Sequence, residues 1–425
     1  MSPAVNLRPW SLTEKFALRF FAVLFIFYVF PFPLDLAGYP EMWWNQLLQI
    51  IVPWIGTHVL HLKEPITIFP NGSGDTTYNY VLLLTQFVCS FIAAVIWSLM
   101  DGKRRRYDHL HYWLRVLVRY FLMYNMFVYG FAKVFHLQMG TPMLSTLITP
   151  LGDKSPMGLA WAYMGFSSGF SAITGWAEVI AGLLLIFRRT VTIGAIVNIV
   201  VTINIVAINF CFDVPVKLFS SMLLLMSVFL LAPDVKRLTG LFLFNKAVSP
   251  KLYPNYHGRK RWLRILLLVL KFLIVAYFLY VNVANSLHGV KLYGDERPLP
   301  TLYGIYDAHL IVRNNDTLPP LRTDYTRWNT LVIQYPNAAV VKLTNDSTKY
   351  FAFEVDTVRK TARVYSYEEN AHRSTLNYHV KGDTLELSGK YFNDSVLFSF
   401  TKRDLKTIRL LNRGFHWINE HPYHR

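Results

Sequence analysis

The chain has little cysteine and little charge. Cys89 and Cys211 are the only two cysteines among 425 residues, and each lies in or at the end of an apolar run. Two isolated cysteines exclude a disulfide framework, a CxxC motif and a cysteine-based zinc site. Charged residues make up 16% of the chain, whereas soluble proteins average about 25%. The composition therefore argues against an ordinary soluble enzyme.

The chain also lacks the short motifs of the common enzyme classes. It has no glycine-rich dinucleotide loop after a strand, no Walker loop, no Gly-x-Ser-x-Gly and no His-Glu-x-x-His. His58 and His61 lie close together on one apolar stretch, but the sequence identifies no carboxylate partner for them. We therefore expect no metal site, and the motifs assign the chain to no enzyme class.

Long apolar runs dominate the first two thirds of the chain. Hydrophobic residues make up 53% of the whole, and seven runs reach or approach the ~20 residues that a membrane-spanning helix needs. The seven predicted spans are residues 16–34, 79–100, 112–134, 169–187, 191–211, 217–233 and 263–285. Residues 42–62 are also apolar, but Pro53 and three tryptophans within them favour a helix lying in the membrane interface.

The distribution of basic residues predicts the orientation of these spans. The formal net charge is +17. With the N-terminus inside, the inner segments carry 17 Lys and Arg, including Arg259, Lys260 and Arg261, and the outer segments before the last span carry 3. Because inner segments are enriched in Lys and Arg, we predict a protein of the cell (inner) membrane with a cytoplasmic N-terminus. The charge thus reflects topology, and we expect no nucleic-acid partner.

The composition changes after Leu287. Gly and Pro residues form a linker, and short segments follow that are separated by turn signals such as Asn-Asp-Ser at residues 345–347. The predicted strands are residues 309–313, 330–334, 338–343, 350–355, 362–367, 374–380, 384–387 and 396–400. Such strands indicate an antiparallel barrel or a sandwich. We expect the aromatic and His-rich terminal segment, residues 413–425, to pack against this β-domain.

The predicted fold is therefore a polytopic α-helical membrane protein with about seven transmembrane helices and a C-terminal extracytoplasmic all-β domain. Ionisable residues inside spans are costly and mark candidate functional sites. Five basic residues lie near an inner boundary, where long side chains are expected to reach the headgroups: Arg19, Arg115, Arg119, Arg264 and Lys271.

Glu178 lies near the middle of a predicted span. Ser171, Gly175 and Gly182 share its helical face, and small residues on a face let another helix approach closely. The carboxyl should therefore face protein. Two interpretations stay open: it is hydrogen-bonded for helix packing, or it faces a ligand, handles a proton or pairs with a cation such as Lys133.

A polar stripe runs along the next span. Asn198, Thr202, Asn209 and Asp213 share one helical face. The stripe indicates either hydrogen bonds between helices or a polar cavity open to the outer side, and both interpretations stay open. We hypothesise that five side chains converge on one ligand-binding site: Lys133, Glu178, Asn209, Asp213 and Lys217.

Two short motifs carry a family resemblance. Arg119 is followed by Gly130-x-x-Lys133, and the run 177–186 leads into Arg188-Arg189-Thr190. Over residues 112–233 the chain resembles the DoxX/DoxD-like family of four-helix membrane proteins. Some members of that family are subunits of a thiosulfate:quinone oxidoreductase, and others are associated with thiol or redox-stress functions. The resemblance implies a quinone as candidate cofactor. It also implies four family-type residues: Arg119, Gly130, Lys133 and Glu178. Arg119 is therefore added to the five candidate ligand-binding residues named above.

These observations predict five regions. They are an N-terminal membrane region (1–111), a DoxX-like core (112–233), a basic cytoplasmic loop (234–262), a seventh span (263–287) and the β-domain (288–425).

Two functions of different classes stay open. In the first, the protein binds a quinone or other lipophile in a polar cavity open to the outer side, with a redox-linked role; an apolar slot with a few polar groups is sufficient for that. In the second, it is a non-catalytic membrane anchor whose β-domain binds a partner subunit or an envelope ligand. A transporter is disfavoured, because no inverted repeat or pair of broken helices is visible.

Protease accessibility tests the predicted topology. A tag after Arg425 is expected to be cleaved by protease added to spheroplasts, and a tag within residues 101–110 is expected to be protected until detergent opens the membrane. The reverse pattern would invert the topology.

Overall fold

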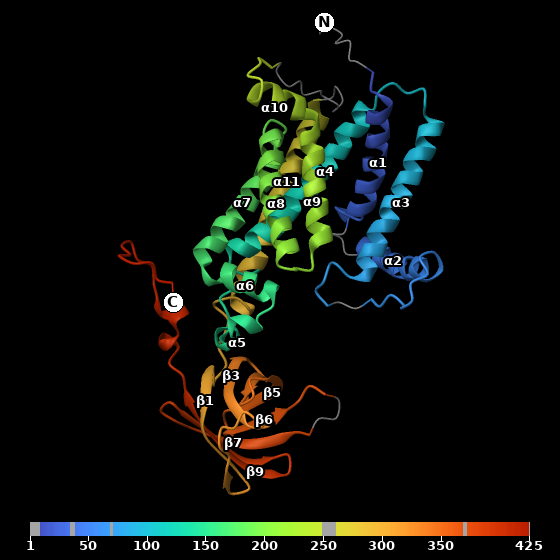
Figure 1. The fold of residues 1–425 in the computed structure, drawn as a ribbon. Coiled ribbons are helices and arrows are strands. Elements are labelled where there is room, and N and C mark those ends of the chain that lie inside the picture. Colours follow the sequence, from blue (N-terminus) through green and yellow to red (C-terminus); the bar gives the residue numbers. More distant parts are fainter. Residues whose placement is uncertain (1–8, 35–38, 69–70, 249–260, 369–371, 425) are drawn as a thin grey trace. The chain divides into compact units, whose positions relative to one another are not determined.

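The computed structural model describes residues 9–34, 39–68, 71–248, 261–368 and 372–424. The chain divides into a helical unit, Met1–Gly140 with Pro156–Val290, and a β-unit, Thr141–Ser155 with Lys291–Arg425 (Figure 1). Arg259 and Lys260, which belong to the predicted inner loop, lie outside the described residues.

Ten α-helices lie in the described residues of the helical unit. They are α1 (Leu12–Val29), α2 (Tyr39–His58), α3 (Thr77–Met100), α4 (Asp108–Val134), α6 (Pro156–Phe166), α7 (Ser168–Ile186), α8 (Val191–Cys211), α9 (Lys217–Leu231), α10 (Val235–Phe242) and α11 (Arg261–Leu292). Capping explains where the first begins: the Glu14 amide donates to Ser11 Oγ at 3.2 Å, and the Ser11 amide donates to Glu14 Oε2 at 2.7 Å.

Among the described residues, five helical segments are long and apolar enough to cross a membrane. They are Thr77–Met100, Ser168–Ile186, Val191–Cys211, Lys217–Phe242 and Arg261–Leu292. The chain thus has the helices of a membrane protein. The two other predicted spans correspond to α1 and α4, which both carry several charged residues. Their place in the membrane, and the count of seven spans, stay predictions.

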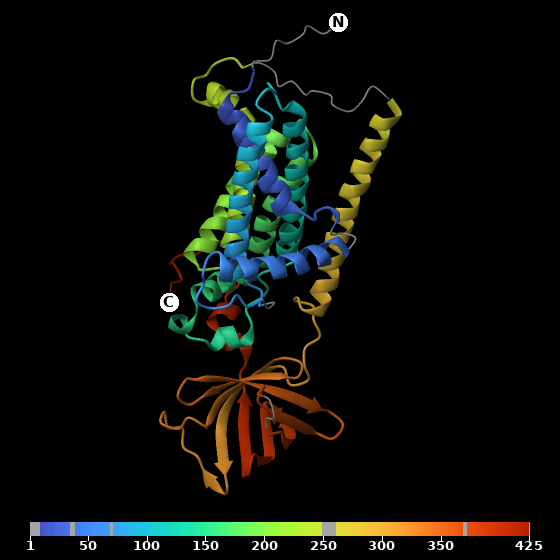
Figure 2. The same ribbon diagram turned by 90° about the vertical axis from the view of Figure 1, so that its right-hand side faces the viewer.

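Helix α4 is central to the helical unit because it packs against α1, α7 and α9. Its Leu122 and Phe127 are fully buried, and they share one hydrophobic cluster with Leu185 of α7 and Met226 of α9. Helix α11 contributes Phe278 to the same cluster, and Figure 2 shows the N-terminal part of α11 standing away from the other helices. In the most apolar part of α11, 11% of the residues are buried within the protein, so most of this helix is exposed.

Helix α2 runs crosswise to α1 and α3 (Figure 2). Leu48 and Val52 on one face are buried in a cluster with Val81 of α3. The opposite face is apolar and exposed, with Trp43 at 70% and Ile50 at 72% exposure. An apolar, tryptophan-bearing face on a crosswise helix agrees with the predicted interfacial helix.

The β-unit is a closed barrel (Figure 1). Its strands are β1 (Gly304–Arg313), β2 (Asp316–Thr317), β3 (Trp328–Tyr335), β4 (Ala338–Leu343), β5 (Thr348–Asp356), β6 (Thr361–Tyr365), β7 (Ser374–Lys381), β8 (Thr384–Tyr391) and β9 (Asp394–Lys402). All pairings are antiparallel and follow chain order from β3 to β9, while β1 pairs with both β3 and β9. The eight predicted strands are confirmed, β2 is a short addition beside β1, and the sheet is a barrel.

Side chains that alternate along the strands fill the barrel. Leu331 and Ile333 of β3 lie in one buried cluster with Phe398 of β9. Trp328 stacks on Phe398, with ring centroids 4.9 Å apart and an interplanar angle of 20°. Because a closed barrel has no unpaired strand edge, this unit completes its core and its backbone hydrogen bonds within one sheet.

Residues 141–155 join the β-unit although they lie between α4 and α6 in the sequence. Their helix α5 (Leu144–Ile148) packs on Ile305, Val332 and Val340. These three side chains point outward from the barrel, because their sequence neighbours face the interior. Helix α5 therefore covers an apolar patch on the outer surface of the barrel.

The terminal segment differs from the expectation. Phe415, Trp417 and Ile418 are 79%, 91% and 77% exposed. The expectation that this segment packs against the β-domain is therefore wrong for its described residues. The barrel interior is already filled, and the apolar patch on its outer surface is covered by α5 together with Leu405 and Ile408.

Candidate functional site

Helices α4 and α7 lie in backbone contact. A Cβ atom added to Gly175 would lie 2.6 Å from the Gly130 carbonyl oxygen and 2.6 Å from the Val134 amide nitrogen. A Cβ added to Gly182 would lie 2.9 Å from the Phe127 ring. Only glycine allows this separation, so the small-residue face predicted for this helix lies against α4.

The close approach places Lys133 beside Glu178. The Lys133 ammonium donates to Glu178 Oε1, and the two side chains are only 7% and 3% exposed. Ser171 Oγ donates to the Lys133 carbonyl at 2.9 Å. Among the described residues, Glu178 Oε2 has no hydrogen-bond partner. The contact found for Glu178 is thus an ion pair between the two helices.

Arg119 holds the end of α7. Its guanidinium donates to the Leu185 carbonyl at 2.8 and 3.0 Å and to the Ile186 carbonyl at 3.0 Å. The last carbonyls of a helix have no partner within it and carry the negative end of its dipole. Arg119 is 6% exposed, so it joins two helices instead of reaching the headgroups as expected.

A second group of polar residues surrounds the start of α9. Lys217 Nζ lies 2.7 Å from Asp213 Oδ1 and 3.8 Å from Asp75 Oδ2. The Asp75 carboxylate also accepts from the Lys217 and Leu218 amides at 2.7 and 3.0 Å, which caps α9. Sequence reasoning missed Asp75 because the helix that it caps begins 142 residues later.

The polar stripe of α8 faces the interior of the helical unit. Asn198, Thr202 and Asn209 are 0%, 1% and 4% exposed. Asn209 Nδ2 donates to Ser220 Oγ at 3.0 Å, which is a hydrogen bond between helices α8 and α9. The Asn198 amide has no hydrogen-bond partner among the described residues.

The six candidate residues therefore fall into three contact groups. One is the Lys133–Glu178 pair, one is Arg119 at the end of α7, and one contains Asn209, Asp213 and Lys217 around the α8–α9 turn. In the part of the chain that the structure describes, no hydrogen bond or ion pair links these groups. The pockets described next are lined by other side chains.

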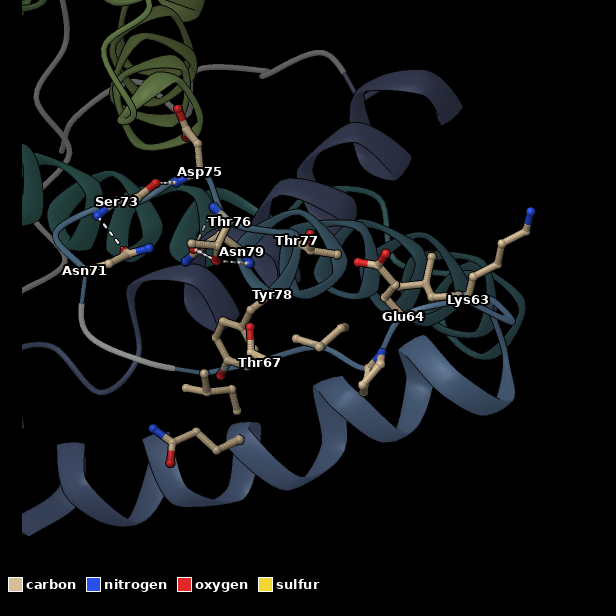
Figure 3. Close-up of a pocket in the computed structure, with 15 residues that line it drawn as sticks. Lys63, Glu64, Thr67, Asn71, Ser73, Asp75, Thr76, Thr77, Tyr78 and Asn79 are labelled. Atoms are coloured by element: carbon tan, nitrogen blue, oxygen red, sulfur yellow. Dashed lines mark hydrogen bonds between the residues drawn. The ribbon is translucent and has the colours of Figure 1, made fainter. Parts of the chain in front are cut away.

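A pocket of about 850 Å³ lies between α2 and the segment that leads from it to α3 (Figure 3). Figure 3 shows Lys63 and Glu64 at one end and Asn71 and Ser73 at the other. The Ser73 amide donates to Asn71 Oδ1 at 2.9 Å. We call this pocket the polar compartment, because most of the side chains that line it can form hydrogen bonds.

A second pocket, of about 540 Å³, adjoins the polar compartment. Ser73 and Asn79 line both pockets, and α2 contributes to both. Gln86, which is 4% exposed, brings an amide to the second pocket. We call this pocket the aromatic compartment after the rings that line it: Phe27, Tyr28, Phe30, Trp44, Tyr129 and Phe219. The two compartments together are the α2 site.

The barrel has a pocket of about 1060 Å³ at one end. Strands β1, β4, β6 and β8 end there, opposite the end where the chain enters β1 and leaves β9. Its rim contains exposed rings, with Tyr350 at 65%, Tyr367 at 64% and Phe392 at 49% exposure. Its charged lining residues balance, two basic against two acidic: Arg313, Lys349, Glu368 and Asp394. We call it the barrel-end pocket.

Among the described residues, no group of three or more His, Cys, Asp or Glu side chains is arranged to hold a metal ion. Cys89 and Cys211 are both exposed and free. The His58 ring stacks on Trp54 with centroids 5.1 Å apart, so this histidine has a packing contact within α2.

Comparison with known proteins finds a relative for part of the chain. Over 124 residues the chain is 36% identical to the "Uncharacterized protein YwoB" of Bacillus subtilis (strain 168). The match covers 29% of this chain and 79% of the relative. No protein-family model and no solved structure matches the chain.

Removing one charge of the α4–α7 pair is expected to destabilise the helical unit. Glu178→Gln keeps the shape of the side chain but leaves the Lys133 charge buried, and breaking a buried ion pair in this way costs roughly 3–5 kcal/mol. Adding Lys133→Met removes the remaining charge and should recover much of the loss. Free energies of unfolding in detergent micelles for both single variants and the double variant measure the coupling.

The exposed pair at the start of α9 is the matched control. The Asp213 side chain is 83% exposed, and pairs of this kind contribute about 0.2–1 kcal/mol. Asp213→Asn should therefore change the free energy of unfolding by no more than that. If the losses from Glu178→Gln and Lys133→Met simply add in the double variant, the two charges are not coupled.

Proposed function

The chain belongs to the same family as the uncharacterized protein YwoB of Bacillus subtilis, and from the geometry of its pockets we propose that it is an integral membrane protein that binds a lipophile of the quinone class in the α2 site. The observation that carries this proposal is the junction of a polar and an aromatic compartment beside one crosswise helix.

The two compartments match the two ends of an amphipathic molecule. Both volumes lie in the range of about 300–1,000 Å³ that small-molecule sites occupy. The aromatic compartment offers flat apolar surfaces to a quinone ring and its tail. Tyr28, Gln86 and Tyr129 bring hydroxyl and amide donors to the same compartment, and a quinone carbonyl accepts hydrogen bonds from such groups.

The crosswise position of α2 gives the ligand a route from the bilayer. Its exposed apolar face suits the membrane interface, so the compartments beside it open at the depth where a lipophile's polar head resides. In the predicted topology, residues 62–78 lie on the outer side, and the site opens there. The protein is then a component of the cell (inner) membrane with its N-terminus in the cytoplasm.

The DoxX-like resemblance of residues 112–233 favours a quinone over other lipophiles. Tyr129 of the aromatic compartment lies within that region. The redox-linked role that we propose depends on the bound molecule being a quinone.

Extraction and mass spectrometry of purified protein test the α2 site. The wild-type protein should retain a quinone through purification in mild detergent. Leu83→Trp places a bulkier side chain in the aromatic compartment and should lower the retained amount about tenfold, equivalent to about 1.4 kcal/mol of binding free energy. Gln86→Leu removes a donor at similar volume and should lower retention less.

The next residue on α3 supplies the control. Leu84 is 48% exposed and does not line the compartment, so Leu84→Trp should retain the ligand at the wild-type level. Circular dichroism and gel filtration confirm the fold of each variant. A phospholipid bound in place of a quinone would contradict the quinone class. Absence of any bound lipophile, together with no binding of added quinone, would overturn the proposal.

The barrel-end pocket favours a second candidate function, in which the helices anchor a ligand-binding β-domain. Its balanced charges suit an uncharged polar ligand, and exposed rings beside polar groups suit the flat apolar faces of sugar rings. Burial raises the pKa of Tyr391, which also lines this pocket, to about 12. Its hydroxyl therefore stays protonated and can donate to a sugar oxygen.

Binding of the full-length protein, in detergent, to an array of neutral oligosaccharides tests this second function. Tyr350→Ala and Tyr367→Ala remove rim rings and should each weaken binding several-fold. Val358→Ala alters an exposed residue in the β5–β6 turn at the opposite end of the barrel and should not. Binding that is insensitive to the rim substitutions, or no binding at all, would exclude the barrel-end pocket as a glycan site.

A further inference from the structure

The C-terminal segment exposes an unusual amount of apolar surface. Six large side chains are exposed between residues 409 and 424: Leu410 (46%), Leu411 (40%), Phe415 (79%), Trp417 (91%), Ile418 (77%) and Tyr423 (51%). Contiguous apolar surface of this kind on a protein marks a contact with a partner or a membrane. None of these six residues lines the α2 site or the barrel-end pocket.

Local contacts organise this segment. Helix α12 (Arg409–Asn412) is followed by a loop that Arg413 ties together: its guanidinium donates to Asn419 Oδ1 at 2.5 Å and lies over the Tyr423 ring at 4.2 Å. Phe415 and Trp417 pack edge to face with centroids 5.0 Å apart. Phe415 and Trp417 thus form a ring pair, Tyr423 is held by Arg413, and all three rings are exposed.

The composition of the segment matches the boundary between lipid headgroups and acyl chains. Tryptophan and tyrosine are enriched at that boundary because their rings combine an apolar body with a polar edge. Basic residues favour the same place where lipids are anionic. From residue 405 to residue 424 the chain carries Lys406, Arg409 and Arg413 against one acid, Glu420.

We propose that residues 409–424 form an interfacial anchor that inserts Phe415, Trp417 and Ile418 into the bilayer in which the helices of the same chain reside. Five helical segments within the described part of this chain are long and apolar enough to cross a membrane, so a bilayer is the apolar phase to which the β-unit is tethered. This anchor is independent of the α2 site. It would hold the barrel against the membrane surface at a second point, besides its links to the helical unit.

Spin-label accessibility in the full-length protein tests the anchor. Both exposed cysteines are replaced (Cys89→Ser and Cys211→Ser), Ile418→Cys receives a nitroxide, and the protein is placed in nanodiscs of phosphatidylethanolamine and phosphatidylglycerol. Oxygen concentrates in lipid, whereas a nickel chelate stays in water. The ratio of the collision rate with oxygen to the collision rate with the nickel chelate should be several-fold higher for a label at residue 418 than for a label at the control position. Val358→Cys is that control, because residue 358 lies in a barrel turn and is 89% exposed.

A second substitution separates insertion from folding. Trp417→Ser in the labelled Ile418→Cys protein leaves the barrel strands untouched, and should shift the accessibility ratio of residue 418 toward that of residue 358. A label at 418 that is as accessible to the nickel chelate as the control would place the segment in water. A label shielded from both reagents would place it against protein, in this chain or a second copy. Either result would overturn the anchor.

Discussion

Backbone contact between α4 and α7 is the constraint on which the rest of the helical unit depends. Because Gly130 and Gly175 leave no room for a Cβ atom between these helices, Lys133 and Glu178 meet where both side chains are buried, and Arg119 reaches the last carbonyls of α7. Because α7 covers this face of α4, helices α1 and α9 pack on its other faces. Those three helices supply Tyr28, Tyr129 and Phe219 to the aromatic compartment.

The same contact explains why the buried charges of α4 and α7 do not line the α2 site. A charge inside a membrane protein is stable when it is paired, and here the pairs hold helices together. The α2 site is instead built from the uncharged rings and amides of its aromatic compartment and from a polar loop that carries Lys63, Glu64 and Asp75. That loop is fixed from a distance, since Asp75 caps α9 and the Gly74 amide donates to the Pro215 carbonyl at 2.8 Å. The start of α9 thus positions the polar wall.

The two units place their apolar side chains differently. The helices leave broad apolar surfaces exposed, with Ile173, Val200 and Leu273 among the exposed side chains. The barrel buries the apolar side chains of its strands inside, and α5 covers an apolar patch on its outer surface. The other exposed rings of this unit include those at the barrel-end pocket, whereas Phe415, Trp417 and Ile418 line none of the pockets described above. We therefore assign these three side chains to a lipid contact.

The sequence by itself determined the features that repeat along the chain. The apolar runs, the eight strands and the face of Ser171, Gly175, Glu178 and Gly182 are all local patterns, and a period of two or of about 3.6 residues is visible without a fold. Only the tertiary structure decided which patterns meet. Pairing of β1 with β9 closed the barrel, Asp75 met a helix 142 residues away, and the polar stripe of α8 turned inward. These contacts join segments far apart in the chain, and a local pattern carries no information about its distant partner.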